Sequence, residues 1–103
     1  MNTRLRRLII EAILDYWQKQ RTAGCTVSEG SFDTLGSPLE SSALYEQLLD
    51  VEEDVPEYAM SEILEDLRSS RLIRASLWPD RIAIRTHGNM TIVGVSPYLF
   101  HEF

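Results

Sequence analysis

The sequence predicts a single α+β domain over residues 1–103, in which three helices are followed by a small antiparallel β-hairpin or sheet. Two observations support this prediction. Apolar residues recur at the three- and four-residue spacing of a helix up to Arg71, and from Ile73 onward they alternate with polar residues as in a strand. In addition, a chain of 103 residues, of which 44% are hydrophobic, can bury one core and is too short for two domains.

The first predicted helix spans residues 3–22. Its inward face at helical spacing consists of Leu5, Leu8, Ile9, Ala12, Ile13, Tyr16 and Trp17. Ile10 and Leu14 lie beside that stripe and widen the apolar arc beyond half of the helix circumference. Gly24 then suits the left-handed residue that ends many helices. Such a helix is covered on more than one side. We therefore expect it at the centre of the fold, with contact of its second flank to another chain as the alternative.

Residues 24–37 are rich in Gly and Ser, and they are predicted to form a long loop to which residues 25–27 can add a very short strand. A second helix is predicted to begin at Ser37-Pro38-Leu39-Glu40 and to run through Leu49. The serine can accept from first-turn amides, the proline has no amide hydrogen to lose, and the glutamate completes a capping box.

The third helix is predicted from Pro56 to Arg71, with Asp54 as its N-cap. Its inward stripe at helical spacing comprises Met60, Ile63, Leu64, Leu67 and Arg71. The outward positions are mostly acidic or polar and comprise Glu57, Tyr58, Ser61, Glu62, Glu65 and Asp66.

Three β-rich runs follow, centred on Ile73 to Leu77, on Ile82 to Ile84 after a turn at Pro79-Asp80, and on Met90 to Val95 after a turn at His87-Gly88-Asn89. Trp78, at the first hairpin tip, is either an interface anchor or folds back on the sheet. The last segment, residues 97–103, is apolar and aromatic. We expect it to dock on the first helix, with docking across a dimer as the alternative.

Charge is distributed unevenly along the chain, whose net charge is −6. Residues 25–67 contain twelve acidic residues and no Lys or Arg, whereas the segments before and after them each have a balance of +3. Such asymmetry bears on partners more than on the fold. The acidic segment is either a binding surface for a basic partner or a solvated face, and the solvated face is the more frequent case in proteins.

Enzymatic, metal and cofactor chemistry have little support in the sequence. Cys25 is the only cysteine, which excludes an internal disulfide and a cysteine-based zinc site. His87 and His101 belong to no metal-ligand spacing, and the five glycines fit no phosphate-binding loop. No apolar run approaches the roughly 18 residues of a membrane span. We therefore expect a cytosolic, non-enzymatic protein without a cofactor, a metal or a membrane contact.

The order of elements resembles the winged helix-turn-helix superfamily. The residues that carry this resemblance are Leu44, Leu48, Ile63, Leu64, Leu67, Leu72 and Ile73, and it covers residues 5–96. The resemblance implies that the third helix enters the major groove of DNA. The outward face of that helix departs from this pattern, because DNA contacts draw on Arg, Lys, Asn and Gln, and acidic side chains are repelled by phosphates.

Our first hypothesis is therefore a winged-helix module for protein–protein contact in regulation. Its acidic face, offered to a basic partner surface, comprises Glu57, Glu62, Glu65 and Asp66. A hydrophobic interface, to a partner or in a homodimer, comprises Ile10, Leu14, Trp17, Trp78, Phe100 and Phe103. The alternative is a DNA-binding transcriptional regulator that uses Arg4, Arg6, Arg7, Arg74, Arg81 and Arg85. For Arg4, Arg6 and Arg7, pairing with the protein's own acids or simple solvation is the plainer interpretation.

Overall fold

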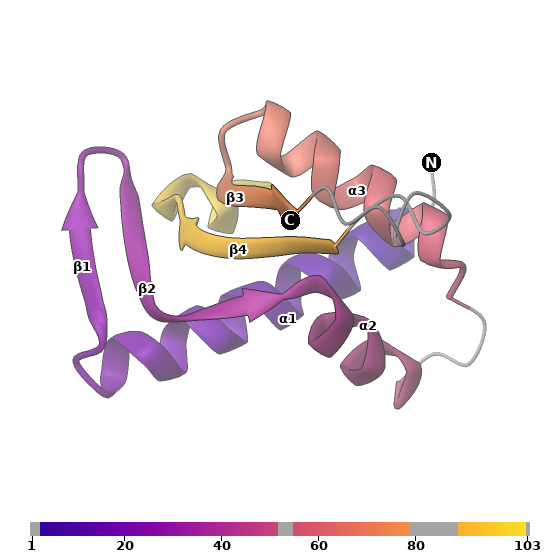
Figure 1. Ribbon diagram of the computed structural model, residues 1–103, viewed down its shortest axis with the longest axis horizontal. Coiled ribbons are helices and arrows are strands. Elements are labelled where there is room, and N and C mark those ends of the chain that lie inside the picture. Colours follow the sequence, from indigo (N-terminus) through magenta and orange to yellow (C-terminus); the bar gives the residue numbers. More distant parts are fainter. Residues whose placement is uncertain (1–2, 52–54, 79–88, 103) are drawn as a thin grey trace.

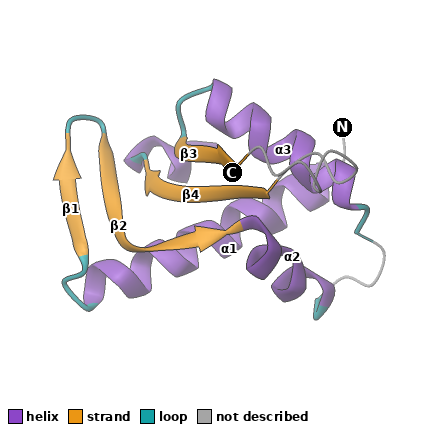
Figure 2. Cartoon of the chain, viewed as in Figure 1, coloured by secondary structure: helices purple, strands orange, loops and turns teal. Residues whose placement is uncertain are grey.

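The computed structural model describes residues 3–51, 55–78 and 89–102, and it has an α+β fold with one four-stranded antiparallel sheet (Figures 1 and 2). The elements are α1 (Thr3–Thr22), β1 (Thr26–Glu29), β2 (Phe32–Glu40), α2 (Ser41–Leu49), α3 (Glu57–Ser69), β3 (Ile73–Trp78), β4 (Asn89–Val95) and the 3₁₀ helix η2 (Pro97–Glu102). The strand order is β1-β2-β4-β3. The α+β class and the first helix are confirmed at the predicted positions.

α1 is the central helix of the fold. It contacts α2, α3, β2 and η2, and Figure 1 shows it running behind the sheet. Six of its residues are buried, namely Leu5, Ile9, Ile10, Ile13, Leu14 and Trp17. The wide apolar arc is thus covered on several sides within one chain. The helix ends at Thr22, and Gly24 has the predicted left-handed conformation with a φ of 72°, while the amide of Cys25 donates to the carbonyl of Gln20.

The segment predicted as a long loop is instead the β1–β2 hairpin, which extends at one end of the molecule (Figure 1). Glu29 pairs with Phe32, so the connection consists of Gly30 and Ser31 alone. Gly30 has a φ of 62°, the left-handed conformation that two-residue hairpins with glycine in the first position require. Gly30-Ser31 was therefore a turn signal. The prediction of a long loop was wrong, whereas the very short strand expected at residues 25–27 corresponds in part to β1.

The predicted helix start at Ser37-Pro38 is also wrong, because residues 37–40 continue β2 and α2 begins only at Ser41. Leu39 is buried and pairs with Ile92 of β4. The ladder is irregular between Thr34 and Leu39, so the proline lies where a regular strand hydrogen bond is interrupted. Two α1 side chains form hydrogen bonds with the backbone of Ser37. The Tyr16 hydroxyl donates to the Ser37 carbonyl, and the Ser37 amide donates to the side-chain oxygen of Gln20.

α3 confirms the predicted inward stripe except at its end. Met60, Ile63, Leu64 and Leu67 are buried, whereas Arg71 is exposed. The helix stops at Ser69, and Arg71 adopts a left-handed φ of 59°. The amide of Leu72 reaches back to the carbonyl of Leu67, which is a Schellman ending with Arg71 in the place glycine usually takes. The predicted N-cap, Asp54, lies outside the described residues.

β3 pairs with β4, and β4 pairs in turn with β2. Val93 is an extra residue in β4 between the pairs Arg74–Gly94 and Ala75–Ile92. This bulge shifts the strand's alternation, so that Met90, Ile92 and Val95 are all buried. The predicted middle strand around Ile82 and Ile84 and its two turns lie outside the described residues.

The C-terminal segment docks on α1 of the same chain, as we expected from the sequence. Leu99 of η2 is fully buried, and the ring of Phe100 lies 5.3 Å from the ring of Trp17 on α1. The side chain of Ser96 accepts from the amide of Tyr98 and so organises the first turn of η2.

Candidate functional site

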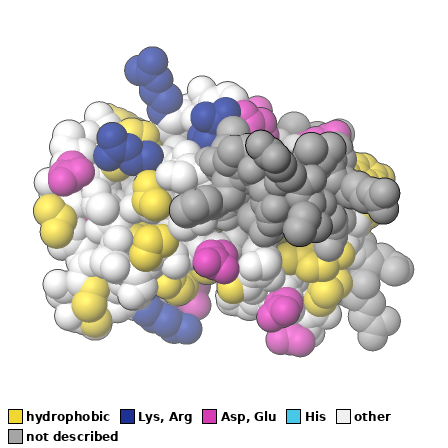
Figure 3. Space-filling model, viewed as in Figure 1, with side chains coloured by type: hydrophobic (Ala, Val, Ile, Leu, Met, Phe, Trp, Pro, Cys, Tyr) yellow, Lys and Arg dark blue, Asp and Glu magenta, His cyan; other side chains and the backbone are white. Residues whose placement is uncertain are grey.

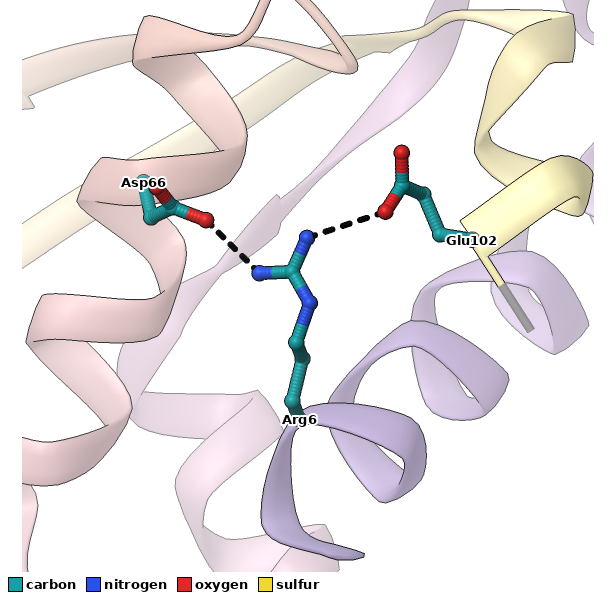
Figure 4. A network of polar contacts seen from close by, with 3 residues as sticks. All are labelled: Arg6, Asp66 and Glu102. Carbon is teal, nitrogen blue, oxygen red and sulfur yellow. Dashed lines mark hydrogen bonds and ion pairs between the residues drawn. The ribbon is translucent and has the colours of Figure 1, made fainter. Parts of the chain in front are cut away.

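Arg6 joins three parts of the chain that are far apart in sequence. One terminal nitrogen of its guanidinium lies 2.7 Å from the Asp66 carboxylate on α3, and the other lies 3.1 Å from the Glu102 carboxylate on η2. Figure 4 shows the side chain rising from α1 between these two partners. The Arg6 side chain is only 18% exposed. Arg6 therefore pairs with the protein's own acids, the plainer of the two interpretations from the sequence.

A surface hollow of about 500 Å³ lies beside this bridge. Its lining combines three arginines of the first turns of α1 with one carboxylate, and it consists of Thr3, Arg4, Arg6, Arg7 and Glu102. Arg4 and Arg7 are exposed. Part of the predicted basic surface is thus gathered at one concave place, which we call the arginine hollow.

The exposed side of α3, which we call the α3 outer face, is formed by Tyr58, Glu62, Glu65, Asp66 and Ser69. Tyr58 and Glu62 are exposed, while Glu65 and Asp66 are partly covered. Figure 3 shows acidic side chains along the upper edge of the molecule, where α3 runs, with a basic side chain beside them. α3 has no Lys or Arg before Arg68.

Two acids of the α3 outer face are engaged within the chain. Glu65 forms an ion pair with Arg68 one turn further along α3, and Asp66 pairs with Arg6. The hydrogen bond and the charge of Glu65 raise the pKa of the Arg68 guanidinium, which stays charged at any ordinary pH. Glu62 has no ion-pair partner among the described residues. It is therefore the acid of this face best placed to meet another molecule.

Three exposed apolar side chains lie at the end of α2 and at the start of α3. Tyr58 is 57% exposed, and Leu49 and Val51 at the end of α2 are 37% and 66% exposed. The backbone here is held by the Tyr45 hydroxyl, which donates to the carbonyl of Val55. Exposed apolar side chains are thus present both at the end of α2 and at the start of α3.

The hydrophobic interface predicted from the sequence is mostly core. Ile10, Leu14 and Trp17 are 0%, 6% and 1% exposed, because α1 is covered by helices and the sheet of its own chain. This corrects their prediction as interface residues. Phe100 is 47% exposed although its ring contacts Trp17. Phe103 and the side chain of Trp78 lie outside the description.

Of the predicted nucleic-acid arginines in the C-terminal half, Arg74 lies among the described residues. Arg74 on β3 is exposed, but its guanidinium lies 3.7 Å from the Glu29 carboxylate and 6.0 Å from the centre of the Phe32 ring. It reaches them across Gly94, which has no side chain to block the path. Arg81, Arg85 and the side chain of Glu57 lie outside the described residues.

Clusters of metal-ligating side chains are lacking in the part of the chain that is described. No group of three or more His, Cys, Asp or Glu residues there can hold a metal ion. Cys25 is exposed beside Ala23, where its thiol lies 3.7 Å from the carbonyl oxygen. Over the same ranges, no helix has the length and apolar character needed to cross a membrane.

Two features of the candidate site were not predicted from the sequence. Glu102 was assigned to an apolar tail, and only the fold brings it to Arg6. Leu49, Val51 and Tyr58 were not proposed as a surface. A signal existed for Val51, since an apolar residue beside Asp50 and Glu52 fits no inward stripe.

Comparison with family models, with curated proteins and with solved structures gives no match to this chain.

Proposed function

We propose that this chain is a regulatory protein-interaction module of winged-helix architecture. The order α1, β2, α2, α3, β3, β4 supports this architecture, together with a sheet in which β4 lies between β2 and β3. The tandem helices α2 and α3 precede the β3–β4 pair, as in winged helices, and the β1–β2 hairpin is an addition to that plan. The assignment of function rests on the site and not on this architecture.

The observation that carries the proposal is the chemistry of the α3 outer face. A DNA-reading helix offers donors and cations to bases and phosphates. The α3 outer face offers Tyr58, Glu62, Glu65 and Asp66, and the first basic residue of α3, Arg68, is paired with Glu65. Carboxylates at that position repel a phosphate backbone and attract a basic protein surface.

The partner expected from this surface is a protein with cationic side chains around an apolar depression. Tyr58 is the natural anchor, because tyrosine is enriched at binding hot spots and carries both an apolar ring and a polar hydroxyl. Leu49 and Val51 are further exposed apolar side chains available to a partner, and Glu62 supplies charge complementarity.

The proposal is tested by comparing the proteins retained by variants of this chain in extracts of its own cells. Tyr58→Ala and Glu62→Lys should both release a protein that the wild type retains, and Glu11→Lys should keep it. Glu11 is a suitable control because it is exposed and lies on α1. With the purified partner, we expect each α3 variant to raise the Kd by roughly tenfold or more, which corresponds to a loss of about 1.4 kcal/mol in binding free energy. Equal retention by all the variants would refute the proposal.

The DNA-binding alternative is tested by titrating a mixed-sequence duplex at low salt. The proposal predicts no saturable binding. Saturable binding whose affinity falls steeply with salt, and which Arg4→Gln or Arg7→Gln weakens, would instead favour a nucleic-acid regulator.

A further inference from the structure

We propose that β1 (Thr26–Glu29) pairs edge to edge with β1 of a second copy of this chain, so that the two sheets join in a symmetric dimer. The strand order places β1 at one edge of the described sheet, and Figure 1 shows the β1–β2 hairpin extending at one end of the molecule. This surface shares no residue with the α3 outer face, and the inference does not depend on the function proposed for that face.

The first argument is the set of hydrogen-bonding groups that the β1 backbone turns outward. In a two-residue hairpin the residues that flank the turn exchange hydrogen bonds, and so does every second pair beyond them. The backbone groups of Val27 therefore point toward β2. The carbonyl of Cys25 does so too, because it lies so close to Gly36 of β2 that a side chain there would collide with it. The N–H and C=O groups of Thr26 and Ser28 point the other way, where no described residue partners them.

The second argument is that β1 lacks the features that protect an exposed edge. Sheets commonly guard their edges with lysine, proline or a bulge. β1 contains no Lys, Arg or Pro, and its pairing with β2 runs without a register shift. Its only charged residue is Glu29, whose carboxylate lies 3.7 Å from the Arg74 guanidinium and accepts from the Thr34 hydroxyl at 3.3 Å. Val27 is 61% exposed. The edge is thus open to a further strand.

The third argument selects a second copy as that strand, because the β1 sequence is complementary to itself in an antiparallel register centred on Val27. In this register the two Val27 side chains face each other in a non-hydrogen-bonded pair, where side chains lie closest. Thr26 of each copy faces Ser28 of the other, and this joins all of the outward backbone groups in hydrogen bonds. Glu29 of each copy faces the uncharged Cys25 of the other, so no like charges are opposed.

The length of the extended segment supports the same register. Gly24 and Gly30 bound it, with left-handed φ values of 72° and 62°, and an extended strand ends at such residues. With Val27 at the centre, Gly24 of one copy comes opposite Gly30 of the other, so the segments overlap over their whole length, whereas any other register shortens the overlap. An interface of one short strand is smaller than that of a permanent dimer, so we expect a weak dimer that forms at high protein concentration.

The first test is sedimentation velocity of the full chain from micromolar to millimolar concentrations, in which we expect a reversible monomer–dimer equilibrium. Ser28→Pro removes an outward N–H at an edge position, where proline is tolerated, and leaves the backbone bonds of the hairpin intact. It should raise the Kd of the dimer by at least about tenfold. The matched control, Ser28→Ala, keeps that N–H and should dimerise as the wild type does.

The second test is disulfide crosslinking, which reads the register directly. Facing residues of a non-hydrogen-bonded pair have Cα atoms about 4.5 Å apart, within the range that a disulfide spans. Cys25→Ser/Val27→Cys should therefore form a covalent dimer under mild oxidation. Cys25→Ser/Ser28→Cys should remain largely monomeric, because position 28 of each copy faces Thr26 of the other. Circular dichroism verifies that each variant is folded.

Each of three results would overturn the proposal. One is a monomer at every concentration, which would leave the edge to a different extended chain or to solvent. Another is the same Kd for Ser28→Pro and Ser28→Ala, which would place the dimer contact on another surface. The last is crosslinking through position 28 as fast as through position 27, which would exclude the register centred on Val27.

Discussion

Ser41 shows how a single hydroxyl connects two elements. It begins α2, is 6% exposed, and accepts a hydrogen bond of 3.0 Å from the amide of Met90 on β4. Ser41→Ala leaves that buried amide without its partner, which costs about 1–3 kcal/mol. We expect this loss in urea unfolding, whereas Ser42→Ala, at an exposed neighbouring position, should stay within about 0.5 kcal/mol of wild type. Equal effects of the two substitutions would contradict this role of Ser41.

Arg71 is a residue at which the backbone is strained. Its φ of 59° is costly for any residue with a Cβ atom, and its side chain is exposed. We therefore expect Arg71→Gly to stabilise the fold by about 0.5–1 kcal/mol, seen as a rise in Tm of a few degrees.

The matched control at this position is Arg71→Ala, which removes the same side chain but keeps the strain. It should leave the Tm nearly unchanged. A similar Tm for the glycine and alanine variants would show that the backbone strain is absent.

At the scale of elements, the β1–β2 hairpin is fastened to α1 by Asp33. One oxygen of its carboxylate accepts from the indole N–H of Trp17 at 3.0 Å, and the other accepts from the Ser28 hydroxyl at 2.9 Å. Trp17 is 1% exposed, so Asp33→Ala leaves a buried N–H unpaired and should cost about 1–3 kcal/mol.

The comparison variant for the hairpin is Ser28→Ala, which removes only the exposed bond to Asp33. It should change the free energy of unfolding by less than about 0.5 kcal/mol. If chemical denaturation finds Asp33→Ala as mild as Ser28→Ala, the carboxylate does not hold the hairpin in place.

The elements that could be predicted are those in which the helical spacing of apolar residues continues over many residues. α1 and the inward stripe of α3 follow from the spacing of residues such as Ile9, Ile13, Ile63 and Leu67, because burying one face dominates their energetics. Ser37-Pro38 misled the prediction because a proline at a strand irregularity has the same local sequence as a proline in the first turn of a helix. Only the pairing of Leu39 with Ile92 decides between them, and that contact is distant in sequence.

The sequence allowed the residue types of the candidate sites to be predicted, but not which of these residues lie close together in the fold. The acids of α3 and the arginines of α1 are visible in the charge pattern. Their pairing is a tertiary property, since Arg6 meets Asp66 and Glu102 only when α1, α3 and η2 pack together. The same packing turned Ile10 and Leu14 from candidate interface residues into core residues.

For the whole molecule, the Arg6 bridge links α1, α3 and η2 but should contribute little stability. Asp66 and Glu102 remain 43% and 36% exposed, and ion pairs so open to solvent are worth about 0–1 kcal/mol. We expect Arg6→Gln to lower the free energy of unfolding by no more than about 1 kcal/mol in thermal or urea denaturation. A loss above about 3 kcal/mol would mean that the bridge, and not the core around α1, holds the helices together.

The uneven charge of the chain has two consequences at this scale. One acid of the acidic segment, Asp66, pairs with Arg6 of α1, and Glu62 remains exposed on the α3 outer face, as does Tyr58. We propose that this face binds a protein.

Photo-crosslinking in cells, with a light-activated amino acid at position 62, tests that claim most directly. Position 11 on α1 serves as the control. We expect a protease-sensitive, nuclease-resistant adduct at position 62 that disappears with Tyr58→Ala, and none at position 11. A nuclease-sensitive adduct, or equal crosslinking at positions 62 and 11, would contradict it.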